Sequence, residues 1–134
     1  MNSKTSYFVK FINAIIGFSL LIYASMGFAE ATTLADPLEA GWKGKPVCER
    51  LFEDTAKRIL RCTFPPNVGH KPHYHVAHFG YALSGGRVQI TDGNGVREVT
   101  LATDSSYSSD GVPWHHILNI GKTTIVYLIV ESKA

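Results

Sequence analysis

The sequence predicts an all-β fold: a single sandwich or barrel domain that follows an N-terminal signal peptide. Three observations support this prediction. Short β-favouring runs recur, turn residues separate them, and no stretch after the leader shows a long amphipathic helical pattern. Once the leader is removed, about 105 of the 134 residues remain, enough for one modest core and not for two. We therefore expect an arm over 30–45 and one domain over 46–134.

The first 29 residues have the composition of a secretory signal peptide. Lys4 and Lys10 give a positive start, residues 11–24 are mostly apolar, and Gly27-Phe28-Ala29 offers small residues for a signal peptidase. The apolar run is shorter than the roughly 20 residues of a spanning helix, and no charged residue closes it. Both features favour cleavage over an uncleaved membrane anchor, so we expect a periplasmic or secreted bacterial protein.

The charge balance argues against some partners. The chain has 13 basic and 11 acidic residues, and the leader removes two lysines and no acid, which leaves 11 of each. The mature chain is therefore near neutral and has no basic block. We expect a small-molecule ligand or substrate, and neither nucleic acid nor a membrane surface as a partner.

Along the chain, residues 30–45 contain proline and glycine with little periodicity, so we expect this arm to add at most an edge strand. A hairpin is expected next, over 46–53 and 57–64. Cys48 and Cys62 are symmetric about its turn, and in an oxidising compartment we expect a disulfide rather than two buried thiols. Closing this loop of about 15 residues would add about 3 kcal/mol to stability.

The remaining strands follow from turn chemistry and β-branched runs. Asp92-Gly93-Asn94-Gly95 is a hairpin turn because its residues tolerate positive φ. Residues 123–131 are apolar on both faces, as expected of a buried central strand. The strands expected after the first hairpin cover 79–83, 87–91, 96–101 and 123–131.

The six histidines lie in two short clusters, His70, His73, His75 and His78, then His115 and His116. On a strand, His73 and His75 leave the same face and can give two imidazole nitrogens to one metal. A third histidine ligand must come from the second cluster, where one of the two adjacent side chains points inward on an extended strand.

These motifs resemble the cupin family over nearly all of residues 46–133. The first cupin motif matches Gly69, His73-Tyr74-His75 and the strand that ends at Gly86, and the second matches the spacing from His115 to Asn119. The resemblance implies a jelly-roll β-barrel in which His73, His75 and His115 bind one divalent transition metal. Fe, Ni, Mn, Cu and Zn all suit an all-imidazole site.

The chain departs from the cupin pattern in two places. The usual Glu of the first motif is missing, and His78 stands in its place when residues are counted back from Tyr81. His78 is predicted as a fourth ligand if the chain turns at 76–77. In that case His78, Gly80 and Ala82 face inward and Phe79, Tyr81 and Leu83 outward; the alternative places His78 at the surface. The second departure is the turn over 110–114, which lacks the usual Pro-x-Gly.

His70 and His116 are not expected to bind the metal, because His70 lies in a loop and His116 has the opposite strand parity from His115. The resemblance leaves three functions open: a mononuclear metal-dependent dioxygenase, a non-catalytic metal- or ligand-binding protein, and an isomerase or lyase of a sugar-like substrate. The acids nearest the motifs, Asp104 and Asp110, lie in turns, so no certain general base is evident. The apolar row of Phe79, Tyr81 and Leu83 predicts a homodimer that covers it.

Overall fold

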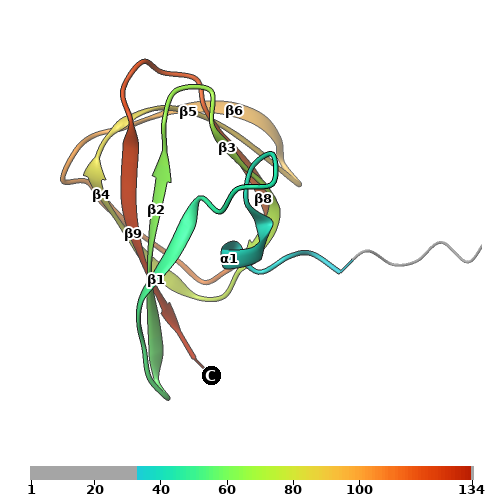
Figure 1. Ribbon diagram of the computed structural model, residues 1–134, viewed down its shortest axis with the longest axis vertical. Coiled ribbons are helices and arrows are strands. Elements are labelled where there is room, and N and C mark those ends of the chain that lie inside the picture. The colour runs from blue at the N-terminus through green and yellow to red at the C-terminus, as the bar shows by residue number, and fades with distance from the viewer. Residues whose placement is uncertain (1–32, 134) are drawn as a thin grey trace, which may run out of the picture. The chain divides into compact units, whose positions relative to one another are not determined.

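The computed structural model describes residues 33–133, so the expected signal peptide lies outside the described residues. One helical turn and nine strands make up this part of the chain (Figure 1). Their bounds are α1 Pro37–Ala40, β1 Cys48–Glu53, β2 Lys57–Phe64, β3 Gly69–His75, β4 His78–Ser84, β5 Gly86–Asp92, β6 Gly95–Leu101, β7 Ser106–Ser109, β8 Val112–Asn119 and β9 Ile125–Ser132.

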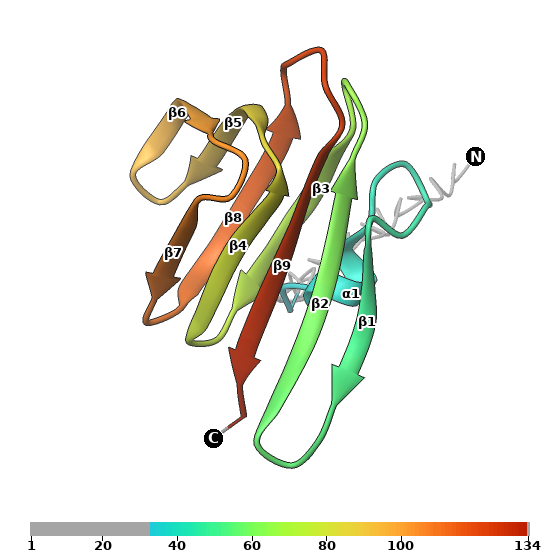
Figure 2. The ribbon, with the colours of Figure 1, turned by 90° about the vertical axis from the view of Figure 1, so that its left-hand side faces the viewer.

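The strands form two antiparallel sheets, and Figure 2 shows β1, β2, β9 and β4 side by side in one of them. The five-stranded sheet has the order β1-β2-β9-β4-β7, and the four-stranded sheet has the order β3-β8-β5-β6. As predicted, β9 is a central strand, paired with β2 on one side and β4 on the other. The predicted all-β jelly-roll class is confirmed.

The hydrophobic core lies on the faces that strand alternation predicts. On β2, Leu60, Cys62 and Phe64 are fully buried, and on β9 Ile125 and Ile129 are as well. Fully burying a side chain such as Leu60 stabilises the fold by about 1.5–3 kcal/mol. The core thus fixes the register of β2 against β9, because a slip of one residue would expose this apolar set.

The first hairpin forms as predicted. Cys48 lies directly opposite Cys62 in the β1–β2 ladder, and the two form a disulfide. The turn is held by the Asp54 carboxylate, which accepts hydrogen bonds from the backbone N–H groups of Ala56 and Lys57, each at 2.8 Å. Local turn chemistry and the disulfide therefore specify the same pairing.

The described part of the arm, residues 33–45, adds no strand to either sheet: it contains the helical turn α1 and makes two isolated β-bridges, from Ala35 to His73 and from Trp42 to Lys45. The reason is local: Asp36 caps the turn by accepting from the Leu38 N–H at 3.0 Å, and Pro37 occupies the first helical position, which needs no N–H. Between residues 33 and 133, no helix is long and apolar enough to cross a membrane.

Candidate metal centre

Three histidine rings converge at the inner face of the four-stranded sheet. His73 and His75 lie on β3, and His115 lies on β8 directly opposite His73 in the ladder. His73 Nε2 is 3.0 Å from His75 Nε2 and 2.9 Å from His115 Nε2. The nitrogen donors of all three rings lie within 4.8 Å of one another, so this cluster could hold a metal ion.

Hydrogen bonds on the far side of two rings fix which nitrogen faces the cluster. His73 Nδ1 donates to the Lys71 carbonyl at 2.6 Å, and His75 Nδ1 donates to Glu131 Oε1 at 2.7 Å. In each of these two rings, Nε2 is therefore the nitrogen that faces the cluster. Burial lowers the pKa of His73 to about 2 and that of His115 to about 3, which keeps both rings neutral.

Two imidazole nitrogens that lie 3.0 Å apart, with the other nitrogen of each ring already hydrogen-bonded, are placed to act as two ligands of one metal cation. The spacing also fits an ion. Two imidazole nitrogens bound at about 2.1 Å to one metal lie about 3.0 Å apart if they subtend about 90°. A tetrahedral angle would separate the same atoms by about 3.4 Å. The residues therefore fit a divalent transition metal.

A partly buried chain of charged groups supports His75. Glu131, fully buried on β9, accepts from His75 and also from Arg58 Nε, and Arg58 Nη2 donates to Asp36 Oδ2 at 2.7 Å. Burial alone would raise the pKa of Glu131, but the hydrogen bonds from His75 and Arg58 outweigh burial and lower this pKa. The carboxylate is therefore ionised and holds the His75 ring in one tautomer and orientation.

Sequence reasoning missed Glu131, although a signal was present. In the run over 123–131 the buried positions are Ile125, Tyr127, Ile129 and Glu131, so strand parity puts this carboxylate on the inner face. An acidic side chain at an inward position of a central strand needs a partner. The partners of Glu131 are His75 and Arg58. Its contact with them depends on how the two sheets face each other, which the sequence pattern does not show.

His78 lies beside the cluster, on the inward face predicted for it. The chain turns at 76–77, His78 and Ala82 are buried, and Phe79 and Leu83 are 43% and 45% exposed. The ring centroid of His78 is 5.0 Å from that of His75. His78 Nδ1 donates to the Val76 carbonyl at 2.8 Å, which leaves a lone pair on Nε2. Its role as a fourth ligand stays a prediction.

Substitutions at His78 test that role. If the ring is a ligand, His78→Ala should weaken metal affinity by about tenfold or more, which corresponds to about 1.4 kcal/mol, and change the metal spectra. His78→Glu should retain the metal, because a carboxylate can replace imidazole as a donor and a methyl group cannot. Metal titration and the absorption spectrum of the Co²⁺ form measure both effects. Equal affinity and identical spectra in wild type and both variants would make His78 a bystander.

The other two histidines lie outside the cluster. His70 is fully buried, and its Nε2 donates to the Pro37 carbonyl at 2.8 Å, so it fastens the arm to β3 rather than lying in a solvated loop. His116 points to the opposite face of β8 and stacks on Trp42 with 5.7 Å between ring centroids. Its buried Nε2 has no hydrogen-bond partner among residues 33–133.

Tyr107 on β7 is a second residue that the sequence did not single out. Its ring fills the space left by Gly80, since a Cβ at Gly80 would lie only 2.3 Å from Tyr107 Cε1. The ring also meets His78 edge-on, with 5.7 Å between centroids. An aromatic side chain therefore occupies the space beside Gly80 and His78.

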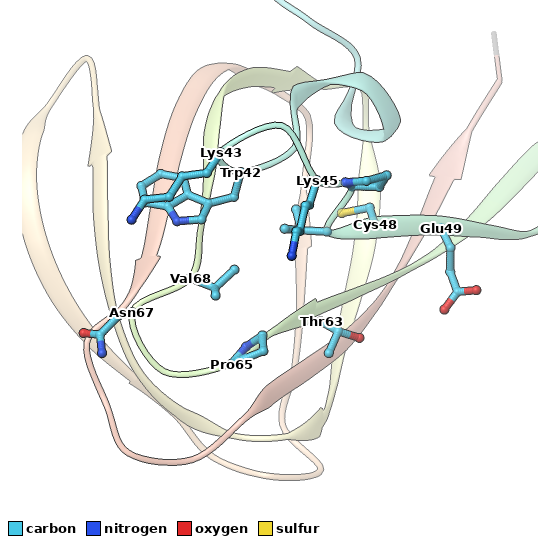
Figure 3. Close-up of a pocket in the computed structure, with 11 residues that line it drawn as sticks. Trp42, Lys43, Lys45, Cys48, Glu49, Thr63, Pro65, Asn67 and Val68 are labelled. Carbon is cyan, nitrogen blue, oxygen red and sulfur yellow. The ribbon is translucent and has the colours of Figure 1, made fainter.

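A cavity of about 370 Å³ opens onto His78 and His115 from between the sheets. A larger hollow of about 750 Å³ lies around Trp42 and the start of β1, where Lys43 and Lys45 are exposed (Figure 3). None of the three clustered histidines lines that hollow, so the smaller cavity is the one that accompanies the candidate metal centre.

Comparison with known proteins supports the fold. No family model and no curated protein matches the sequence. Among solved structures, a cupin domain from Bordetella pertussis Tohama I is similar, with a TM-score of 0.62 and 19% identity over 66% of this chain and 93% of that one. A cupin superfamily protein from Desulfitobacterium hafniense DCB-2 gives a TM-score of 0.52 with 14% identity, over 65% of this chain and 76% of that one.

At these identities the likeness concerns the fold and not the activity. The protein therefore has the fold of small cupin domains, with a histidine cluster that could bind a metal where the first and second cupin motifs meet.

Proposed function

We propose that the protein is an exported cupin that binds one divalent transition metal through His73, His75 and His115, with His78 as a fourth ligand. We further propose that it acts as a mononuclear dioxygenase on a small molecule. The observation that carries the proposal is the pair of Nε2–Nε2 approaches at 3.0 and 2.9 Å, in which two of the three rings have the other nitrogen engaged.

The surroundings of the cluster favour oxidation over acid–base chemistry. Two carboxylates beside the cluster are both engaged: Glu131 accepts from His75 and Arg58, and Asp92, opposite His115 in the β5–β8 ladder, accepts from Arg97 Nη1 at 2.7 Å. An isomerase or lyase needs a free base to move a substrate proton. A dioxygenase adds both atoms of O₂ to the substrate, so it needs neither an external reductant nor such a base.

The chain's own residues then have separate tasks. A bound transition metal would supply open coordination positions and redox or Lewis-acid chemistry. His73, His75 and His115 would hold it, Glu131 orients His75, and the apolar walls of the adjoining cavity exclude water from the reaction.

Elemental analysis and oxygen uptake test this function. Protein purified without an affinity tag should carry close to one equivalent of metal, and the His73→Ala/His75→Ala double variant should lose it. The matched control is His116→Ala, which removes a histidine outside the cluster and should leave the metal content unchanged. Oxygen uptake with small organic substrates should depend on that metal. Full metal retention in the double variant would refute the site, and metal without oxygen uptake would favour the binding protein.

Export is supported by two independent features, the composition of the first 29 residues and the Cys48–Cys62 disulfide. Disulfides persist in oxidising compartments and are rare in the cytosol. A mature N-terminus near residue 30 in protein recovered from the periplasm, measured by mass spectrometry, is the expected result. Full-length chain in the cytoplasmic fraction would contradict it.

We also propose a homodimer that covers the outer face of the five-stranded sheet. Phe52, Ile59, Val130 and Phe79 lie side by side across four strands, and Phe52 and Phe79 are 44% and 43% exposed. A flat apolar row of this kind is self-complementary across a two-fold axis. Light scattering should report a dimer, which Phe79→Glu should dissociate and Tyr74→Glu, on the other sheet, should not. A monomeric wild type at micromolar concentration would contradict it.

A further inference from the structure

The cavity beside the histidines has mostly apolar walls. Val88 and Ile90 on β5, Val99 and Leu101 on β6, and Ile117 on β8 line it, and strand alternation places all five on the inner face of the four-stranded sheet. Its volume of about 370 Å³ lies at the small end of the range for ligand pockets. The walls therefore suit a small, largely apolar molecule.

The same alternation brings one charged pair to this inner face. Arg97 precedes Val99 and Leu101 on β6, and Asp92 follows Val88 and Ile90 on β5. Asp92 lies opposite His115 in the β5–β8 ladder, so the ion pair stands at the end of the cavity where His115 lies. Arg97 thus brings a positive charge to a cavity whose walls are mostly apolar, and Asp92 is its ion-pair partner there.

Asp92 positions Arg97 but accepts from only some of the hydrogen-bond donors of the Arg97 guanidinium group. One carboxylate oxygen of Asp92 accepts from Arg97 Nη1, and the other accepts from the Asn94 N–H at 2.8 Å. A guanidinium group has five N–H donors in a planar fork that matches a carboxylate. Arg97 is half exposed, so its remaining donors are available to a ligand.

Two tyrosines, Tyr107 and Tyr127, also line the cavity, and a phenol hydroxyl can donate as well as accept a hydrogen bond. The Asp92 and Arg97 charges cancel. With a divalent ion in place the site is cationic, and an anionic ligand is favoured.

We propose that this cavity binds a small apolar carboxylate, whose hydrocarbon body lies against the β5, β6 and β8 walls and whose carboxylate is held by Arg97. The proposal rests on the proposed metal centre and names the substrate class of that same site. Asp92 acts as a positioning residue that aims the guanidinium group.

Calorimetry with Zn²⁺-loaded protein tests the proposal, because Zn²⁺ has no redox chemistry and no turnover interferes. The probes are phenylacetate, phenylacetamide, which has the same shape without the charge, and acetate, which has the charge without the apolar body. Phenylacetate should bind at least about tenfold more tightly than either of the others, a difference of about 1.4 kcal/mol.

Three variants locate the binding. Arg97→Gln should reduce phenylacetate affinity to that of the amide. The matched control is Arg87→Gln, which removes an exposed ion pair with Glu98 from the same hairpin and should change nothing. Val99→Trp should fill the cavity and abolish binding whatever happens at Arg97.

Several results would overturn the proposal. Equal affinity for the acid and the amide would refute the anion preference, and unchanged binding in Val99→Trp would refute the cavity. If affinity survives Arg97→Gln and is lost on zinc removal, the carboxylate binds the metal and not Arg97. Zinc content measured on the same samples separates the proposed metal centre from the proposed carboxylate site. Protein without zinc refutes the metal centre, whereas protein that holds zinc and binds no carboxylate refutes only this inference.

Discussion

Replacing Glu131 with leucine is expected to lower the free energy of unfolding by about 3–5 kcal/mol, because the change leaves the Arg58 guanidinium group without its buried partner. The same change removes the acceptor that fixes His75, so metal affinity should fall about 10- to 100-fold. Urea unfolding measures the first effect and metal titration the second. The expected loss is large because Glu131 is fully buried and serves two partners at once.

Two further variants separate the charge from the hydrogen bonds. Glu131→Gln keeps an oxygen that can accept from one partner, so its metal affinity should lie between those of wild type and Glu131→Leu. Glu98→Gln removes an exposed carboxylate that also pairs with an arginine, and it should cost at most about 1 kcal/mol. If Glu131→Leu were as stable and bound metal as tightly as the Glu98 variant, the buried chain from Asp36 to His75 would have no structural role.

Removing the Cys48–Cys62 disulfide is expected to cost about 2–5 kcal/mol, with about 3 kcal/mol from the entropy of the unfolded chain. Both sulfur atoms lie in the core, so alanine is the better replacement because it adds no buried polar group. Urea unfolding of Cys48→Ala/Cys62→Ala should give a lower midpoint than oxidised wild type. Reductant should destabilise the wild type and leave the variant unchanged. Alkylation of both thiols in unreduced periplasmic protein would show that the bond does not form there.

Much of the fold followed from local patterns. The alternation over 57–64 gave the buried face of β2, and the Asp92-Gly93-Asn94-Gly95 turn gave the β5–β6 hairpin. Both rest on backbone geometry within a few residues, which the sequence specifies directly. The arm was less predictable. Asp36-Pro37 is a helix-start signal, but a single turn is too short to show a helical period.

The candidate metal centre was partly predictable for a similar reason. The spacing of His73 and His75 places two rings on one face of a strand, and parity places only one of His115 and His116 on the inner face. The resemblance to the second cupin motif indicated His115. Spacing alone did not establish that these rings meet. Their approach depends on the pairing of β3 with β8, whose strands are separated by long stretches of chain.

The sequence by itself therefore determined the all-β class, the disulfide pairing and the histidines that form the cluster. Only the tertiary structure decided which groups surround that cluster. Glu131 reaches His75 across 56 positions of sequence, and the ring of Tyr107 on β7 fills the space that Gly80 leaves on β4. Strand alternation fixes the face to which a side chain points, whereas its partner is set by the register between strands and by the packing of one sheet against the other.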